Sequence, residues 1–403
     1  MDFKNAYKTV TFWIFVALFA GIAFGIAAPE MAQNMDIFSK IFLKLIKTIV
    51  APLLLSTLVI GIAGHADMKQ VGRMGWKSLV YFEVATTIAL AFGLIAANTI
   101  RPGDGIDLSS VDKSAAITVA KQDWKDIILH IFPENIAKSI AEGQVLQVVV
   151  FSIFFAIGLS MVTNQKHKAT MLGAMESLAE VMFKFTKIVM YFAPLGVFGA
   201  MAYAVGKMGP DVLYSLAKLL LTVYASLIAF VLLVLLPVAL FFKIKIGKFL
   251  KAVAEPVTIA FGTASSEAAL APAMQRLEEY GVPRKFVSFV LPTGMSFNLD
   301  GSTLYLSAAA IFVAQAQGVE LSIGQQLIMM LTLMLTSKGV AGVARASLVI
   351  LMGTIATFGL SDTPIYIILA VDVLMDMART SVNMLGNCLA TVVVAKWENE
   401  FED

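Results

Sequence analysis

Long, unbroken apolar runs constrain this chain more than any other feature of its sequence. The first part of the chain carries them at about 10–28, 37–62, 75–100, 144–163, 185–205 and 214–242. A run of about 20 apolar residues matches the ~30 Å hydrocarbon core of a bilayer. Lipid offers no partner to an unpaired backbone group, so only helices and closed barrels cross it. A barrel needs alternating segments of about ten residues, which these runs lack. We therefore predict an all-α polytopic membrane protein.

The composition supports this class and excludes others. Hydrophobic residues make up 59% of the 403 residues and charged residues only 14%, whereas soluble chains carry about 25% charged residues. The net charge of +2 comes without the concentrated basic face that nucleic acid requires, so we expect no nucleic-acid partner. The single cysteine, Cys388, can form neither an intrachain disulfide nor a thiolate metal cluster. The run at 10–28 exceeds the roughly 7–15 apolar residues of a signal peptide, so we interpret it as a retained span.

Basic residues between the runs predict an orientation. The clusters are Lys69, Arg73 and Lys77; Lys166 and Lys168; and Lys243, Lys245, Lys248 and Lys251. All three lie on the cytoplasmic side if the N-terminus does, as the positive-inside rule prefers. We expect a multi-pass protein of the inner (plasma) membrane with both termini in the cytoplasm.

The pattern changes near residue 250, where Gly, Ser, Thr and charged residues begin to interrupt the apolar runs. Two paired half-length segments, near 252–278 and 324–358, alternate with longer spans near 286–316 and 364–395. Paired, broken hydrophobic segments are the best sequence pointer to a transporter binding site. We therefore expect residues 1–245 to be mainly scaffold and residues 246–403 to form a transport core.

A polar stripe runs through the last span, VDVLMDMARTSVNMLGNCLATVVVAKW. Its members are Asp372, Asp376, Arg379, Asn383 and Asn387, with Thr380 at the edge. Their spacing of four, three, four and four keeps them within about 80° of one helix face. Ionisable residues inside a membrane span usually pair or line a polar cavity. The stripe is therefore either a structural ion pair or a site for a zwitterionic ligand, in which an arginine holds a carboxylate.

A second polar cluster interrupts the preceding span, in PTGMSFNLDGSTLY. Gly294 and Gly301 would break the helix and free carbonyl groups, and Asn298 and Asp300 add side-chain oxygens. Such oxygens form hard-cation sites in broken transporter helices; the alternative is a hydrated kink whose aspartate pairs elsewhere.

The two half-length pairs have small, polar tips. The first reads GTASSEAALAP and contains Ser265 and Ser266, and the second reads TSKGVAGVARAS and contains Gly339, Gly342 and Ser347. Helices that begin at such tips can direct their N-terminal amides at an anion. Otherwise the tips are ordinary loops.

Taken in order, these elements resemble the glutamate transporter family, also called dicarboxylate/amino acid:cation symporters, and are most similar to its bacterial glutamate/aspartate members. SFNLDGSTLY is similar to the family's break in its seventh span, and DMARTSVNMLGN to the substrate stripe of its eighth. The resemblance implies eight transmembrane helices, two re-entrant hairpins, inverted repeats and a homotrimer. It also implies an elevator mechanism in which the second hairpin is the gate.

The resemblance also implies site residues. Arg379 would hold the substrate's side-chain carboxylate and Asp376 its amino group. The remaining substrate positions would be Asn383, Thr380, Ser302, Ser265 and Ser266. A cation site, with Na⁺ possible at Asn298, Asp300 and Asn387, would also include Gly294, Ser296 and Thr86. No cofactor is expected beyond the coupling ion, Na⁺ or H⁺.

Several positions depart from the family pattern. Asn387 stands where sodium-driven relatives often have an aspartate, and Leu306 stands where animal relatives place a proton-handling glutamate. A family arginine is replaced by Ala264 and Met377. Arg345, where relatives usually have proline and glycine, either supplies this charge or points to water.

The acid at Asp376 favours an amino acid over a C4-dicarboxylate, because a buried carboxylate beside a dianion would be uncompensated. A C4-dicarboxylate symporter stays as the alternative, and an ion or anion channel as the rival class, since polar stripes also line pores. An enzyme is not expected, because the chain lacks a nucleophile–histidine pair, a metal-ligand set and a phosphate loop. The choice between Na⁺ and H⁺, the preference between glutamate and aspartate, and any K⁺ return step stay open.

Overall fold

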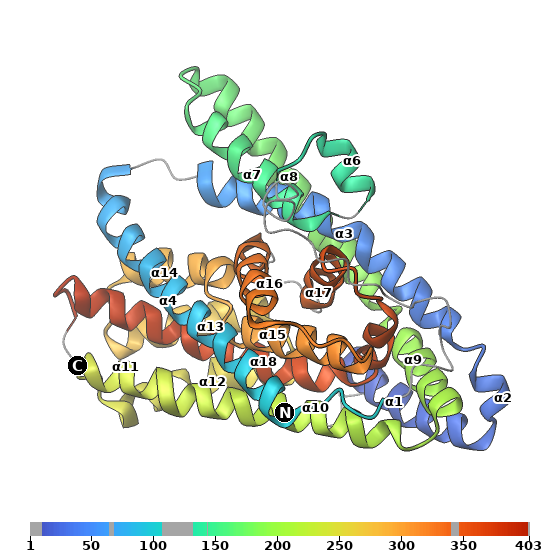
Figure 1. Ribbon diagram of the computed structural model, residues 1–403. Coiled ribbons are helices and arrows are strands. Elements are labelled where there is room, and N and C mark those ends of the chain that lie inside the picture. The colour runs from blue at the N-terminus through green and yellow to red at the C-terminus, as the bar shows by residue number, and fades with distance from the viewer. Residues whose placement is uncertain (1–9, 64–67, 107–131, 143, 340–345, 402–403) are drawn as a thin grey trace.

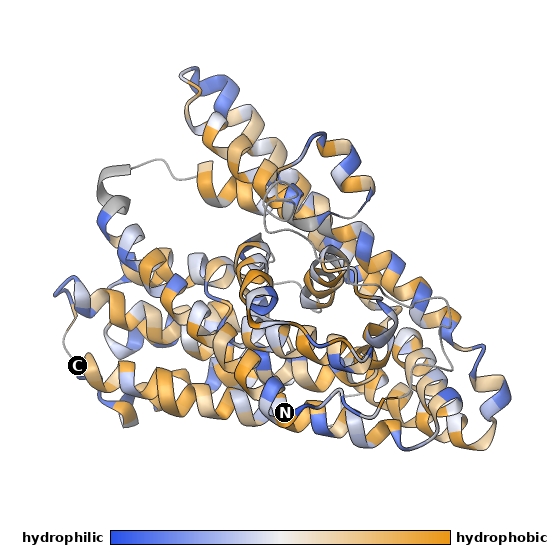
Figure 2. Cartoon of the chain, viewed as in Figure 1, coloured by the Kyte–Doolittle hydropathy of each residue, from blue (hydrophilic) through white to orange (hydrophobic). Residues whose placement is uncertain are grey.

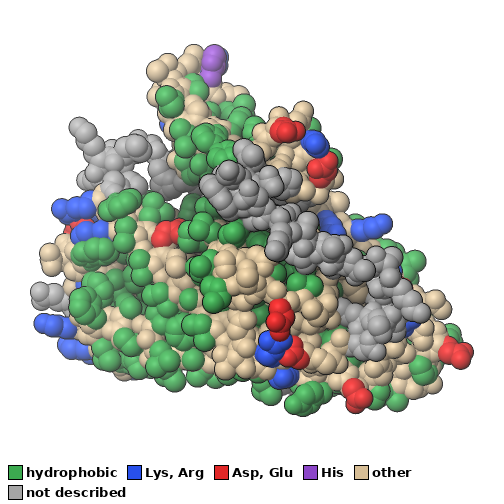
Figure 3. Space-filling view, viewed as in Figure 1, with side chains coloured by type: hydrophobic (Ala, Val, Ile, Leu, Met, Phe, Trp, Pro, Cys, Tyr) green, Lys and Arg blue, Asp and Glu red, His purple; other side chains and the backbone are tan. Residues whose placement is uncertain are grey.

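The structure is a computed structural model that describes residues 10–63, 68–106, 132–142, 144–339 and 346–401. Within these ranges every regular element is a helix (Figure 1). Four helices there are long and apolar enough to cross a membrane: Pro29–Ile60, Arg73–Ile100, Val212–Phe241 and Arg284–Ala316. Hydrophobic residues occupy most of each helix, and hydrophilic ones gather toward helix ends and connections (Figure 2). The visible face is likewise rich in hydrophobic side chains (Figure 3). The chain is therefore all-helical with several membrane-spanning segments.

Most helices of the first half of the chain pack around α3 or α9, whereas α4 packs mainly against α15 (Asp300–Ala316). The helices of this half are α1 (Val10–Ala27), α2 (Pro29–Ala32), α3 (Asp36–Ala63), α4 (Met68–Ile100), α6 (Ile136–Ala141), α7 (Val145–Ser160), α8 (Gln165–Met190) and α9 (Ala193–Met208). Helix α3 packs against α7, α8 and α9, and α1 packs along α9. Gly21 allows this close approach, because a Cβ there would meet the backbone oxygen of Phe198 at 2.8 Å.

The run predicted as a span over 185–205 is not one straight helix, because it falls on two helices that together are long and apolar enough to cross a membrane. Helix α8 ends at Met190, and α9 starts at Ala193 after a bend of 48°. Pro194 lies in the first turn of α9, where a missing N–H costs nothing, whereas inside a continuous helix it would break the ladder. The proline therefore separates two helices that the apolar pattern merges.

The predicted run at 214–242 is continuous but not regular. Helix α10 (Val212–Phe230) passes through a π-helical turn (Val231–Leu235) into α11 (Leu236–Phe241). Pro237 lies in the first turn of α11 and removes one backbone donor. A π turn is a usual way to absorb such a gap.

The second half contains two pairs of short helices and two longer spans. The pairs are α12 (Ile246–Thr263) with α13 (Ser266–Tyr280), and α16 (Ile323–Thr336) with α17 (Ala346–Thr357); the spans are α14 (Arg284–Phe297) with α15 (Asp300–Ala316), and α18 (Thr363–Trp397). Helices α12 and α13 pack against each other, and so do α16 and α17. The first pair turns at Ala264, whose backbone is left-handed with φ 49°.

Helix α18 lies at the centre of this half. It packs against α12, α14, α15 and α10 (Figure 1), and its residues are buried over most of its length. The polar stripe of this helix therefore faces protein rather than lipid.

Candidate substrate and cation site

Arg379 is the centre of the polar stripe and is 1% exposed. Its Nε donates to Asp376 Oδ1 at 2.9 Å and its Nη1 to Asp372 Oδ1 at 3.1 Å. The Tyr305 hydroxyl also donates to Asp372 Oδ1 at 3.1 Å, and the Tyr305 ring centre lies 4.2 Å from the guanidinium carbon. The guanidinium is thus neutralised by its own helix, and the ion pair that the spacing allowed is present.

Asn383 joins the stripe to the start of α15. Its Oδ1 accepts from the backbone N–H groups of Gly301 and Ser302 at 2.8 and 3.2 Å, and its Nδ2 donates to Ser302 Oγ at 2.9 Å. Helix α15 has no side-chain cap from its own N-cap residue, Leu299. Asn383 therefore caps α15 from a different helix, satisfying donors that a helix start leaves free.

Thr380 completes the substrate cluster at the predicted edge. Its hydroxyl donates to Asp376 Oδ1 at 3.4 Å. Five of the predicted substrate residues thus lie together in one buried region, namely Ser302, Asp376, Arg379, Thr380 and Asn383. The arrangement offers a guanidinium, a carboxylate and amide and hydroxyl groups, which are complementary to a zwitterion.

The helix break falls between the two glycines that were expected to cause it, while Gly294 and Gly301 themselves lie within α14 and α15. Helix α14 ends at Phe297, and α15 begins at Asp300. Asn298 and Asp300 are both 0% exposed, and the Asn298 amide donates to Asp300 Oδ2 at 3.2 Å. The break thus buries a carboxylate beside an amide.

Three side-chain oxygens around this break lack a hydrogen-bond partner among the residues that the structure describes. They are Asn298 Oδ1, Asp300 Oδ1 and Asn387 Oδ1. Gly386 packs against the Asp300 carboxylate and Gly294 against the Asn387 amide oxygen. Buried hydrogen-bond acceptors that receive no hydrogen bond need an explanation. A hard cation, which prefers oxygen ligands, fits these three oxygens.

The predicted serines of the first tip make local contacts within their own segment. The Ser265 hydroxyl caps α13 by accepting from Ala268 N–H at 3.3 Å, and Ser266 is buried in the first turn of α13. Ser296 is half-buried on α14. Arg345 lies outside the described residues, so its role stays a prediction.

Thr86 contacts Lys338, a residue that the sequence patterns did not single out. The Thr86 hydroxyl donates to the backbone oxygen of Phe82 at 2.6 Å and accepts from Lys338 Nζ at 3.0 Å. Lys338 follows α16 in a short 3₁₀ turn, Ser337–Gly339. The available signal was its charge in the otherwise small and apolar tip TSKGVAG.

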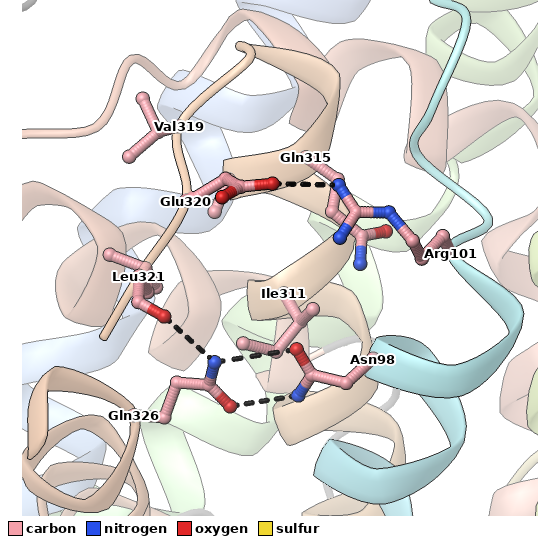
Figure 4. A pocket seen from close by; sticks show the side chains of 9 residues that line it. Asn98, Arg101, Ile311, Gln315, Val319, Glu320, Leu321 and Gln326 are labelled. Carbon is pink, nitrogen blue, oxygen red and sulfur yellow. Dashed lines mark hydrogen bonds and ion pairs between the residues drawn. The ribbon is translucent and has the colours of Figure 1, made fainter. Parts of the chain in front are cut away.

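Two cavities lie outside this region. One, of about 620 Å³, separates α3, α6 and α7 from α17 and is lined by Lys47, Pro52, Ser139, Glu142 and Met352, among others. The other, of about 130 Å³, lies where α4, α15 and α16 meet (Figure 4). There Asn98 and Gln326 exchange amide hydrogen bonds, and Arg101 lies 3.3 Å from Glu320 (Figure 4). These contacts hold α16 against α4.

A broken span beside a buried ionic stripe is typical of membrane transport proteins. A profile of the sodium:dicarboxylate symporter family matches residues 10–397. The chain belongs to the sodium:dicarboxylate symporter family, so it is a symporter and not an enzyme, and the predicted family relationship is confirmed.

Full-length relatives carry two kinds of substrate name. The chain is 40% identical over 400 residues to the proton/sodium-glutamate symport protein of Geobacillus stearothermophilus, covering 97% of this chain and 94% of that protein. It is 41% identical over 416 residues to the proton/glutamate-aspartate symporter of Escherichia coli (strain K12), covering 99% and 95%. It is also 38% identical over 403 residues to the C4-dicarboxylate transport protein of Bacillus subtilis (strain 168), covering 98% and 95%.

Proposed function

We propose that the chain transports acidic amino acids, glutamate and aspartate, together with a cation. The observation that carries this proposal is the buried contact between Arg379 and Asp376. An incoming side-chain carboxylate would take a place beside Arg379, while the substrate's ammonium would take a place beside Asp376. Each new charge then meets an opposite one, which a buried site requires.

A C4-dicarboxylate is the second candidate, because a relative of similar identity carries that name. Such a dianion has no ammonium for Asp376, so its second carboxylate would lie beside an uncompensated buried charge. The pairing of Asp376 with Arg379 therefore favours an amino acid.

For the coupling cation we propose the break between α14 and α15. Asn298, Asp300 and Asn387 would supply its oxygens, with Na⁺ as the ion that this donor set suits. Asp300 and Asp376 are buried carboxylates on which a proton could ride instead.

For the assembly and its motion, we propose eight transmembrane helices, with α12–α13 and α16–α17 as re-entrant hairpins, in a homotrimer of the bacterial inner membrane. Both termini would lie in the cytoplasm. Residues 1–245 would serve mainly as scaffold and 246–403 as a core that moves as an elevator. The cavity lined by α3, α6, α7 and α17 lies at the boundary of these two parts.

Uptake into proteoliposomes tests the substrate. Radiolabelled glutamate, aspartate and succinate would be offered separately under a sodium gradient and under a proton gradient. We expect uptake of both amino acids and little of succinate. Asp376→Asn should reduce amino-acid uptake at least about tenfold, because it removes the charge beside the substrate's ammonium. A loss of about 1.4 kcal/mol of binding free energy already gives that factor. Asp362→Asn, the same change at the exposed start of α18, should have little effect.

Two outcomes would contradict the proposal. Uptake of succinate alone would establish the dicarboxylate reading. Flux without counterflow of labelled against unlabelled substrate would establish a channel, because only a carrier exchanges substrate across the membrane.

A further inference from the structure

Lys338 places a buried positive charge against the helix break. Its side chain is 11% exposed. The ammonium nitrogen lies 3.0 Å from the Thr86 hydroxyl oxygen, 3.0 Å from the backbone oxygen of Phe297 and 3.0 Å from Glu83 Oε1. A lysine ammonium has three N–H donors. Each donor therefore has one oxygen, and the group is fully satisfied by the protein.

Two of these oxygens are of the kind that a mobile cation would use. Phe297 is the last residue of α14, so its carbonyl has no partner in its own helix. The Thr86 hydroxyl donates its hydrogen bond to the backbone oxygen of Phe82, which leaves a lone pair on the hydroxyl oxygen for a cation. Both oxygens lie at hydrogen-bonding distance from nitrogen, whereas hard cations take oxygens at about 2.0–2.6 Å. The present geometry suits an ammonium group.

The charges around Lys338 also favour the ammonium group over a sodium ion at this position. Glu83 forms an ion pair with it, and the buried carboxylate of Asp300 interacts with it electrostatically. Asn387, on the other side of the break, adds no charge. A sodium ion placed on the Thr86 and Phe297 oxygens would lie directly against the ammonium and be repelled.

We propose that Lys338 is a tethered cation. Its ammonium occupies the position between α4 and the end of α14 that a coupling ion from solution would otherwise fill. The oxygens of Asn298, Asp300 and Asn387 then form a separate position for an exchangeable cation. The inference rests on the proposed function for its consequence in transport, but ion binding itself can be measured without substrate.

The position of Lys338 in the chain gives this cation a second effect. The 3₁₀ turn that carries it, Ser337–Gly339, follows α16 directly and contacts α14 and α3. Seating the ammonium therefore fixes this turn against α4 and α14. The charge that fills the position and the turn that packs against α14 are therefore parts of one element.

Sodium binding by the purified full-length protein tests the inference. Radioactive sodium would be bound at equilibrium without substrate, and glutamate affinity would be measured by calorimetry over a range of sodium concentrations. The variants are Lys338→Met and Lys338→Gln, which remove the charge, and Lys338→Arg, which keeps it. Lys187→Met, on the exposed surface of α8, is the matched control.

We expect the two uncharged variants to bind one more sodium ion than the wild type. The slope of log Kd for glutamate against log sodium concentration should steepen by about one, because each linked ion adds one to that slope. Lys338→Arg and Lys187→Met should match the wild type. Should Lys338→Met fail to give a monodisperse protein, the comparison of Lys338→Gln with Lys338→Arg decides.

Unchanged or reduced sodium binding in the folded uncharged variants would overturn the inference, because Lys338 would then be only an anchor for its turn. Failure of the wild type to bind glutamate or aspartate would instead reject the proposed substrate. In that case the sodium count still decides the role of Lys338.

Discussion

The guanidinium of Arg379 lies 3.1 Å from the carboxylate of Asp372, seven residues earlier on α18, and both side chains are buried. Two helical turns separate the residues, so the long arginine side chain runs back along the helix to reach the carboxylate. Asp376, one turn closer, holds the same group through Nε. Any substrate carboxylate must therefore compete with carboxylates already in place.

Asp372→Asn tests this competition. The change keeps the shape of the side chain but removes one of the two charges on Arg379. We expect the free energy of unfolding of the empty protein to fall by about 1.5–3 kcal/mol, the usual value of a hydrogen bond to a charged group. Stabilisation by added glutamate should rise, because its carboxylate replaces the missing charge. Thermal unfolding in detergent, with and without glutamate, measures both effects.

Tyr305→Phe is the matched control for that experiment. It removes the hydroxyl that donates to Asp372 but leaves the ring over Arg379. We expect a loss of about 1.5–3 kcal/mol, because the acceptor of this hydrogen bond is a charged carboxylate, but no added response to glutamate. An equal response in both variants would mean that the charge of Asp372 does not compete with substrate.

The polar stripe could be predicted because its spacing is local. Residues separated by three, four or seven positions share one helix face whatever surrounds the helix, and the structure brings Asp372, Asp376 and Arg379 together as expected. The break at Asn298 was likewise marked by its neighbouring glycines. These features depend only on the segment that contains them.

Contacts between distant segments could not be predicted in this way. Lys338 reaches Thr86 across 252 residues, and Asn383 caps α15 across 82. No periodicity specifies which helix will supply a hydrogen-bond partner to the free end of another helix. The bend before Ala193 is a different case, because Pro194 was visible in the sequence but its apolar neighbours concealed the break.

Gly386→Ala should damage the cation site. In a helix interior alanine is favoured over glycine by about 1 kcal/mol. Here a Cβ would lie 2.2 Å from the carboxylate oxygen of Asp300, so this buried side chain would have to shift. We expect a net loss of about 1–3 kcal/mol from overpacking, together with weaker stabilisation by sodium. Unfolding curves at several sodium concentrations measure both.

Gly173→Ala in α8 is the control, because nothing lies within 4 Å of a Cβ added there. This variant should be more stable than the wild type by about 0.5–1 kcal/mol and should respond normally to sodium. If Gly386→Ala behaved in the same way, the close packing of Gly386 on Asp300 would be wrong.

Glu398 ties the end of α18 to α4. It forms ion pairs with Arg73 and with Lys77, whose Nζ lies 2.5 Å from Glu398 Oε1. Burial alone would raise the pKa of Glu398, but the hydrogen bonds from Lys77 and Arg73 outweigh it and lower the pKa below the ordinary value of 4.5. A lowered folded-state pKa means that the ionised form stabilises the fold above pH 4.5. This contribution is lost as the pH falls through the lower, folded-state value.

Glu398→Gln should therefore lower the melting temperature at pH 7 and lose this effect in acid, below the folded-state pKa. Glu400→Gln is the control, because Glu400 pairs with Lys285 at an exposed position, where ion pairs contribute about 0–1 kcal/mol. Melting temperatures measured across this pH range give the comparison. A cost of Glu398→Gln that did not change with pH would contradict the assigned ion pairs.

Asn387→Asp should convert the exchangeable cation site into a stronger one. Asn387 is 1% exposed, and its amide has no hydrogen-bond partner in the described part of the chain. A carboxylate there adds a second negative charge near Asp300, so the empty site becomes less stable while a bound cation gains a partner. We expect the sodium concentration for half-maximal thermal stabilisation to fall at least about tenfold, since a gain of about 1.4 kcal/mol in the free energy of sodium binding suffices. Asn399→Asp, the same change at an exposed position after α18, should leave it unchanged. If Asn387→Asp instead made stability and uptake depend on pH without changing the sodium response, the new carboxylate would be taking a proton, and the site would belong to a proton-driven cycle.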